Sequence, residues 1–179
     1  MQWGEFEQRQ PKLAAVGATR LIEPGVILVV TIRADGSPRL SPVEPLIVDG
    51  ALFLSMLWNS RKAADLLRDP RILAHSIVTG RDGGDGEFKV RGTARVEADS
   101  RVQARFAATA AATVGWEPTL GRFHLFSVDI DDVVFIRYDE PTGDQFLSAW
   151  PPGREFVRRG TSATSLGRPE ARRDLLVPD

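Results

Sequence analysis

The chain has 179 residues, of which 42% are hydrophobic and 26% charged, the composition of an ordinary globular protein of one domain. Its formal net charge of −1 argues against a nucleic-acid-binding protein, and the lack of cysteine excludes disulfides, thiolate metal sites and cysteine nucleophiles. No apolar run approaches the ~20 residues of a membrane span. The N-terminal sequence MQWGEFEQRQ does not have the pattern of a signal peptide, so we expect a cytoplasmic protein without a membrane partner.

The first residues predict a helical segment followed by a buried strand. Residues 3–22 fit a helix, which Pro11 either breaks or restarts. Residues 26–32, VILVVTI, are almost all β-branched or apolar, the pattern of a strand that is buried on both faces.

A hairpin is predicted to follow. A turn returns the chain as an antiparallel strand over residues 38–48, and a second turn leads into a strand over residues 51–57. Pro42 and Pro45 have no backbone N–H to donate to a ladder. They therefore indicate a sheet edge or a bulge, where a ligand can approach the backbone.

The stretch from Phe53 to Arg71, FLSMLWNSRKAADLLRDPR, predicts a strand, a polar break and one short helix. Asn59 or Ser60 can cap the helix, and Pro70 ends it because proline disfavours the α conformation in the preceding residue.

Further strands and a helix are predicted in the second half. Residues 72–78 and 88–96 fit strands, and a helix capped at its start spans about residues 100–113. The loop GRDGGDGE at residues 80–87 predicts a hairpin tip. It lacks the ligand spacing of a calcium-binding hand, and its negative charge argues against a phosphate site.

The C-terminal third predicts the last strands and a tail. Residues 123–138 fit a pair of strands with a bulge or bend at Asp131-Asp132, and residues 145–150 fit a short final strand. We expect a single domain over residues 1–160 and a poorly ordered tail over residues 161–179, because apolar periodicity is absent there. Six or seven antiparallel strands with flanking helices predict a mainly β fold, a small Greek-key barrel.

Two cations stand in the first turn of the helix that follows Ser60. Arg61 and Lys62 are unfavourable there, since a helix N-terminus carries about half a positive charge and unpaired N–H groups. A solvated basic helix end is one interpretation. The other is a phosphate site, where an anion meets free N–H donors, a hydroxyl, a guanidinium and an ammonium group.

The order Ser-Arg-Lys, short amphipathic helix, Asp69-Pro70-Arg71 and apolar strand resembles the flavin-binding split β-barrel family typified by pyridoxamine 5′-phosphate oxidase. The resemblance covers about residues 25–96. It implies a split β-barrel fold and a cofactor, FMN or the deazaflavin F420, bound at the interface of a homodimer.

The resemblance also implies which residues bind the cofactor. Arg61 and Lys62 would bind the phosphate, and Ser60 would donate to it from the helix cap. Ser55 matches a position whose hydroxyl contacts the phosphate or the ring. Val43 would offer its backbone to the polar edge of the ring.

Other candidates are less constrained. Glu87 aligns loosely with a ring-contacting glutamine of the family. Trp58 and Trp150 are candidates to stack on a planar ring, although tryptophan is more often found in a core or an interface. His75 and His124 each lie within an apolar strand, which is typical of core histidines. The alternative, suggested by relatives that bind haem, is that one of them ligates iron.

The C-terminal region departs from the true oxidases. Those enzymes carry an arginine-rich motif with a histidine that holds the substrate phosphate, whereas this sequence has no histidine after His124. Arg154, Arg158 and Arg159 remain as possible anion ligands. The sequence therefore predicts an FMN-binding oxidoreductase that acts on a small planar substrate. The alternatives are an F420-dependent reductase of the same fold and a non-catalytic module that binds flavin or haem.

Overall fold

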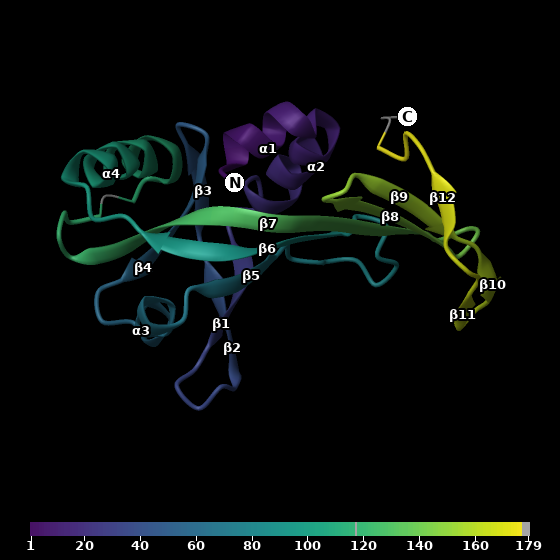
Figure 1. Ribbon diagram of the computed structural model, residues 1–179, viewed down its shortest axis with the longest axis horizontal. Helices are drawn as coiled ribbons and strands as arrows, with labels where there is room; N and C mark the ends of the chain where they lie inside the picture. Colours follow the sequence, from purple (N-terminus) through teal and green to yellow (C-terminus); the bar gives the residue numbers. More distant parts are fainter. Residues whose placement is uncertain (117, 177–179) are drawn as a thin grey trace.

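The computed structural model in Figure 1 describes residues 1–116 and 118–176 as four helices around one large sheet, with a separate small hairpin. The prediction of a mainly β protein with flanking helices is confirmed. The helices are α1 (Trp3–Arg9), α2 (Pro11–Leu21), α3 (Arg61–Arg68) and α4 (Ser100–Val114). The strands are β1 (Ile27–Ile32), β2 (Pro38–Val43), β3 (Pro45–Val48), β4 (Ala51–Leu57), β5 (Arg71–His75), β6 (Glu87–Val96), β7 (Phe123–Asp139), β8 (Asp144–Trp150), β9 (Arg154–Arg158), β10 (Gly160–Ser162), β11 (Ser165–Leu166) and β12 (Glu170–Arg172).

Strand β7 is the centre of the sheet. One of its edges pairs with β6, and its other edge pairs first with β4, through residues 123–127, and then with β8, through residues 133–139. All of these pairings are antiparallel. The sheet therefore divides along β7, which gives the split barrel that the resemblance implies.

The sequence predicts two strands over residues 123–138, and this was wrong. The chain forms one strand of 17 residues. The predicted bulge is present, because Arg91 faces Asp132 while Gly92 faces Ile130, which leaves Asp131 as the extra residue. A bulge bends a strand without ending its ladder.

The predicted single strand over residues 38–48 was also wrong. The chain breaks at Glu44, so that β2 pairs with β1 whereas β3 pairs with β4. Pro42 and Pro45 flank this break on edge strands, as their missing donors predict. Among the described residues no ladder joins β2 to β4, and this unpaired line between the two strands is called the seam below.

The helices cover both sides of β7. Figure 1 shows α1, α2 and α4 on one side of the strand and α3 on the other. Pro11 is the first residue of α2, so it restarts the helix, where its missing N–H costs nothing. Trp3 and Phe6 of α1 are buried in the main core, and their rings pack edge to face at 5.5 Å.

The chain beyond Trp150 adds strands that the sequence does not reveal. Strand β9 pairs with β8 and buries Val157 completely, so residues 145–150 are not the final strand. Strands β10 and β11 form the small hairpin, and β12 pairs with β9. All three residues of β12 are exposed, and residues 177–179 lie outside the described part of the chain. That the tail over residues 161–179 is poorly ordered stays a prediction.

We expect a protein truncated after Arg168 to keep its fold. The deletion removes the exposed strand β12 and the partly buried Leu176. We expect this to lower the unfolding free energy by roughly 1 kcal/mol and the melting temperature by about 2–4 °C. Thermal unfolding followed by circular dichroism tests this. Val157→Ala is the comparison variant. It removes two methyl groups from a fully buried side chain and should lower the melting temperature more than the truncation does. A larger loss for the truncation than for this variant would contradict the prediction.

Candidate functional site

The start of α3 is fixed by local capping. Ser60 is the N-cap residue, and its Oγ accepts a hydrogen bond from Ala63 N at 3.3 Å. Asn59 takes the left-handed conformation, φ 63°, which turns the chain sharply out of β4. The sequence-based prediction of the helix, its cap and its end before Pro70 is confirmed.

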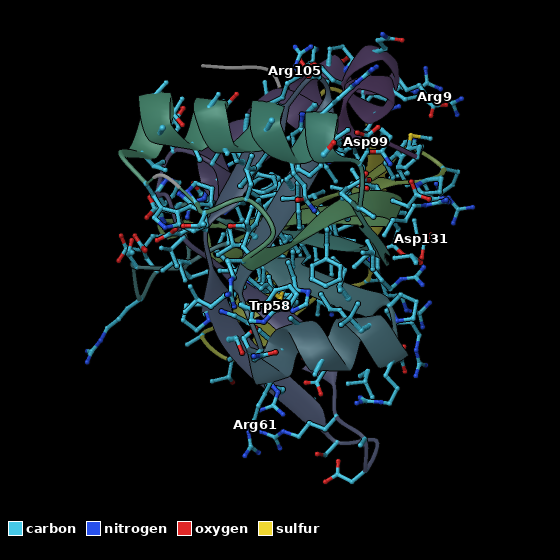
Figure 2. The ribbon with its side chains drawn as sticks, turned by 90° about the vertical axis from the view of Figure 1, so that its left-hand side faces the viewer. Arg9, Trp58, Arg61, Asp99, Arg105 and Asp131 are labelled. Atoms are coloured by element: carbon cyan, nitrogen blue, oxygen red, sulfur yellow. The ribbon has the colours of Figure 1, made fainter. Side chains whose placement is uncertain are left out.

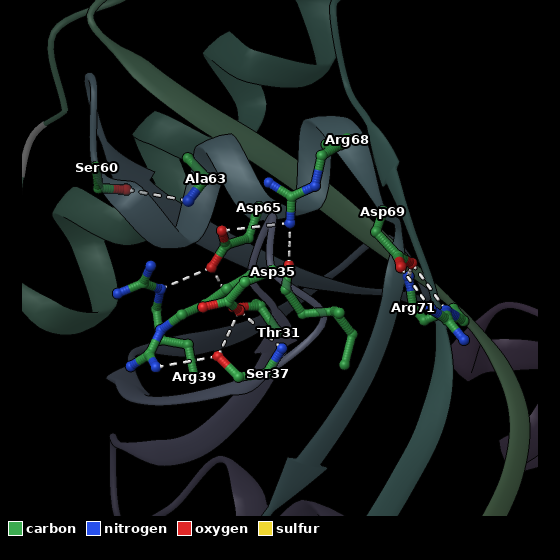
Figure 3. A network of polar contacts seen from close by, with 12 residues as sticks. Thr31, Asp35, Ser37, Arg39, Ser60, Ala63, Asp65, Arg68, Asp69 and Arg71 are labelled. Atoms are coloured by element: carbon green, nitrogen blue, oxygen red, sulfur yellow. Dashed lines mark hydrogen bonds and ion pairs between the residues drawn. The ribbon is translucent and has the colours of Figure 1, made fainter.

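A buried carboxylate holds α3 on the barrel (Figure 3). Asp65 Oδ2 accepts hydrogen bonds from Thr31 Oγ1 of β1 at 2.9 Å and from Arg39 Nε of β2 at 2.6 Å. Arg68 Nη2 lies 3.5 Å from the other oxygen. Burial by itself would raise the pKa of Asp65, but the hydrogen bonds from Arg39 and Thr31 and the nearby cations outweigh it and lower the pKa. The carboxylate therefore stays ionised and ties the helix to both strands.

A cavity of about 420 Å³ opens at the seam, beside the start of α3. Strands β2 and β4 form its walls, α3 contributes Lys62, and the end of α4 reaches it from the other side of β7. Its lining is Val26, Pro42, Val43, Glu44, Ser55, Met56, Leu57, Lys62, Val114 and Trp116. The structure thus brings three predicted residues together at one cavity: Val43, Ser55 and Lys62. The other two, Ser60 and Arg61, lie at the start of α3 but are not part of the lining.

The two cations at the helix start have different environments. Lys62 is half-buried, and its Nζ donates a hydrogen bond to the carbonyl oxygen of Pro42 at 2.7 Å. Burial lowers the pKa of Lys62, and the negative charge of Glu44 partly opposes this. Arg61 is exposed and extends outward from the start of α3 (Figure 2).

The helix start has the donors that a phosphate needs. Within the described residues nothing accepts a hydrogen bond from the backbone N–H of Arg61 or Lys62, or from the Arg61 guanidinium. Two free N–H groups, a guanidinium and an ammonium group suit a phosphate dianion in charge and in hydrogen bonding. This donor set fits the phosphate of a flavin-type cofactor.

Neither candidate tryptophan lines the cavity. Trp58 stacks on the ring of His124, at 4.8 Å between centroids and 5° between planes. Trp150 packs against Phe6 in the main core.

The remaining candidates are engaged elsewhere. Glu87 lies 3.2 Å from His75 Nε2 and 2.9 Å from Lys89 Nζ, at the far end of β6. Burial would raise the pKa of Glu87, yet the hydrogen bonds from Lys89 and His75 lower it. Among the residues that the structure describes, no group of three or more histidines and carboxylates converges as a metal site.

The C-terminal arginines do not reach the cavity. Arg158 Nε donates to the carbonyl oxygen of Gly167, and Arg159 pairs with Asp144 at 2.5 Å. Both lie on or next to β9, at the opposite end of the molecule from α3 (Figure 1). Arg154, also on β9, is absent from the lining as well.

Sequence reasoning missed the contribution of α4. Val114 and Trp116 line the cavity although they lie more than fifty residues beyond Lys62 in the chain. Glu44, which stands between the two edge prolines, was missed too. The proline pair was the available signal for Glu44, while no local pattern connects Trp116 with the helix start.

Comparisons with known proteins agree with this geometry. The family model described as pyridoxamine 5′-phosphate oxidase matches residues 16–137. The chain belongs to the pyridoxamine 5′-phosphate oxidase family. No curated protein matches the sequence significantly.

Solved structures of this family and related ones share the fold. A putative pyridoxamine 5′-phosphate oxidase from Listeria innocua aligns with a TM-score of 0.56 at 14% identity, covering 69% of this chain and 94% of that one. An F420 reductase aligns at 0.52 and 16% identity, covering 65% and 94%. The haem storage protein HutZ from Vibrio cholerae aligns at 0.55 and 16% identity, covering 73% and 92%. At these identities the likeness shows the fold alone.

In the described part of the chain, no helix is both long and apolar enough to span a membrane.

We expect Asp65→Asn to destabilise the protein by about 3 kcal/mol, the low end for a broken buried pair, because Arg39 keeps some contact with solvent. Urea unfolding at pH 7 measures this. The matched control is Glu5→Gln, since Glu5 and its partner Arg9 are both exposed and the loss of a surface pair should change little.

The pH dependence follows from the lowered pKa of Asp65. A carboxylate with a lowered folded pKa stabilises the fold above its unfolded pKa, near 3.8, and this contribution is lost as pH falls through the folded value. The difference between wild type and Asp65→Asn should therefore shrink below about pH 4. A difference that stays constant down to pH 2.5 would contradict the role given to the ionised carboxylate.

Proposed function

We propose that this protein is a cytoplasmic, homodimeric oxidoreductase that binds FMN and acts on a small planar substrate. One observation carries the proposal. The helix start with two unpaired N–H groups and two cations lies beside a cavity that is otherwise mostly apolar. An anionic tail at the helix and a planar ring in the cavity match these two environments.

The chain's own residues would bind and orient the cofactor. Arg61, Lys62 and the capping Ser60 hold the phosphate, while Ser55 and the backbone of Val43 contact the ring. The Asp65 network keeps α3 in place for this task. A bound flavin supplies the electron transfer, so no acid–base pair has to be provided by the protein.

An F420-dependent reductase is the second candidate. The fold of this chain resembles that of an F420 reductase, and the same helix start suits the phosphate of either cofactor.

A non-catalytic binding module is the third candidate, since the fold is also like that of the haem storage protein HutZ. Against haem, His75 contacts Glu87, and His124 is stacked on Trp58. Catalysed electron transfer from reduced FMN or F420 to an added planar acceptor, measured without oxygen and with one acceptor reduced for each cofactor oxidised, separates an enzyme from a binding module.

Replacing both cations, Arg61→Ala with Lys62→Ala, should weaken cofactor binding about 100-fold or more, since each charge-assisted hydrogen bond contributes about 1.5–3 kcal/mol. The unfolding free energy should change by less than about 0.5 kcal/mol. Fluorescence titrations with FMN and with F420 measure the affinities, and the tighter ligand identifies the cofactor.

The control for this variant is Arg9→Ala with Lys12→Ala, which removes the same charge from exposed positions of α1 and α2. It should bind the cofactor as wild type does. Unchanged affinity of the Arg61/Lys62 variant for both cofactors would refute the phosphate site.

The homodimer is a further part of the proposal. The sequence suggests an apolar interface made of Leu40, Val43, Leu46, Met56 and Trp58. In the structure Val43 and Met56 face the core, at 3% and 2% exposure, whereas Leu40 and Trp58 are exposed at 61% and 46%. A second copy that covers Leu40 and Trp58 would remove this apolar surface from water.

We expect sedimentation velocity at low micromolar concentration to show a dimer, and we expect added cofactor to strengthen it, because a ligand that binds only the paired form stabilises that form. Leu40→Glu should favour the monomer. A wild-type monomer that binds FMN at full affinity would show the interface to be unnecessary.

A further inference from the structure

The cavity at the seam is approached by two chemically different elements. From α3, Lys62 brings a positive charge. From the other side of β7, the end of α4 brings only the apolar side chains of Val114 and Trp116. The proposed function places the cofactor phosphate at the start of α3 and the ring against Ser55 and Val43. It leaves the side of the cavity formed by Val114 and Trp116 without a ligand.

Trp116 is part of the cavity wall and packs against the residues below it. The preceding Gly115 ends α4 in the left-handed conformation, φ 68°, and turns the chain back toward the sheet. The indole packs edge-on against Phe123, at 6.3 Å and 79°. Phe123 belongs to the buried cluster under α4 that also contains Phe53 and Phe106. The ring therefore packs against this cluster while it lines the cavity.

Two other apolar residues of the cavity lining are exposed to solvent. Leu57 of β4 is 71% exposed and Val114 is 54% exposed, yet both line the cavity. A planar ring placed between them and Trp116 would bury this surface and contact the indole face.

The charges of the lining disfavour an anionic ligand on this side. Among the described lining residues, Lys62 is the one cation and Glu44 the one carboxylate. Once Lys62 is used by the cofactor phosphate, a second phosphate or carboxylate would meet Glu44 and no free cation. A site of this kind rejects a ligand both by repulsion and by leaving its charge unpaired.

We infer that the second ligand of this cavity is a planar aromatic molecule without negative charge, and that Trp116 determines this specificity. The inference rests on the proposed function, because it assigns Lys62 to the cofactor. It names the substrate class that the proposed function leaves open, and it gives Trp116 and Glu44 roles in recognition.

The test compares two probes that share the naphthalene ring, 2-naphthol, which is uncharged at pH 7, and naphthalene-2-sulfonate, which is an anion. Isothermal titration of the FMN-loaded protein should show 2-naphthol binding about tenfold tighter or more, a preference equal to roughly 1.4 kcal/mol. Trp116→Ala should weaken 2-naphthol binding by about tenfold, and Trp116→Phe should retain most of it, since a phenyl ring still offers an aromatic face.

Two further variants control the comparison. Val96→Ala shortens an exposed apolar side chain that lies outside the lining and outside the proposed dimer interface, and it should leave binding of both probes unchanged. Glu44→Gln removes the repelling charge without changing the shape of the side chain. It should narrow the preference for 2-naphthol by strengthening sulfonate binding.

The outcomes separate this inference from the proposed function. Equal or tighter binding of the sulfonate, or unchanged 2-naphthol binding in Trp116→Ala, would overturn the inference even if FMN binds. If neither FMN nor F420 binds, the probes are titrated into the cofactor-free protein. Loss of 2-naphthol binding in Trp116→Ala would then support the Trp116 site while the proposed function fails.

Discussion

The hydrogen bonds from Thr31 and Arg39 to the ionised carboxylate of Asp65 are the interactions on which the position of α3 depends. This carboxylate lies on α3, and it is bound by a hydroxyl from β1 and a guanidinium from β2. A short helix has little stability of its own, so its position must come from tertiary contacts. The Asp65 contacts fix α3 relative to β1 and β2 and thereby set where the helix N-terminus points. The helix start, with its unpaired N–H groups, and the cavity are adjacent for this reason.

The cavity itself is the consequence of an incomplete ladder. Strand β2 ends at Val43, β3 begins at Pro45, and the two pair with different neighbours. Proline cannot donate to a ladder, so the backbone of β2 and that of β4 separate at this point instead of closing the barrel. At the open seam the carbonyl oxygen of Pro42 accepts a hydrogen bond from Lys62. An unpaired sheet edge is prone to pair with another chain, whereas here the edge borders the cavity.

The positive charge at the start of α3 is unfavourable for folding and would be favourable for binding an anion. Arg61 and Lys62 add positive charge to a helix end that is already positive, and the pKa of Lys62 is lowered by burial. A bound anion, as proposed above, would offset both effects. Residues that are unfavourable in the free protein and favourable in a complex are typical of a binding site rather than of a structural element.

The sequence by itself determined the fold class, the helix after Ser60 with its cap and its proline stop, the edge prolines and the bulge near Asp131. These features depend on local chemistry, namely side-chain periodicity, capping, and a missing N–H group. It also predicted an anion site at this helix start, because two cations there conflict with the helix dipole.

Only the tertiary structure decided that residues 38–48 form two strands with different partners, that β7 continues through its bulge, and that β9 follows Trp150. Pairing partners are set by contacts between distant segments, which leave no local pattern. The same reason explains why Trp116 was not foreseen. It reaches the cavity because Phe106 of α4 packs on Phe53 and Phe123, and that packing exists only in the folded protein.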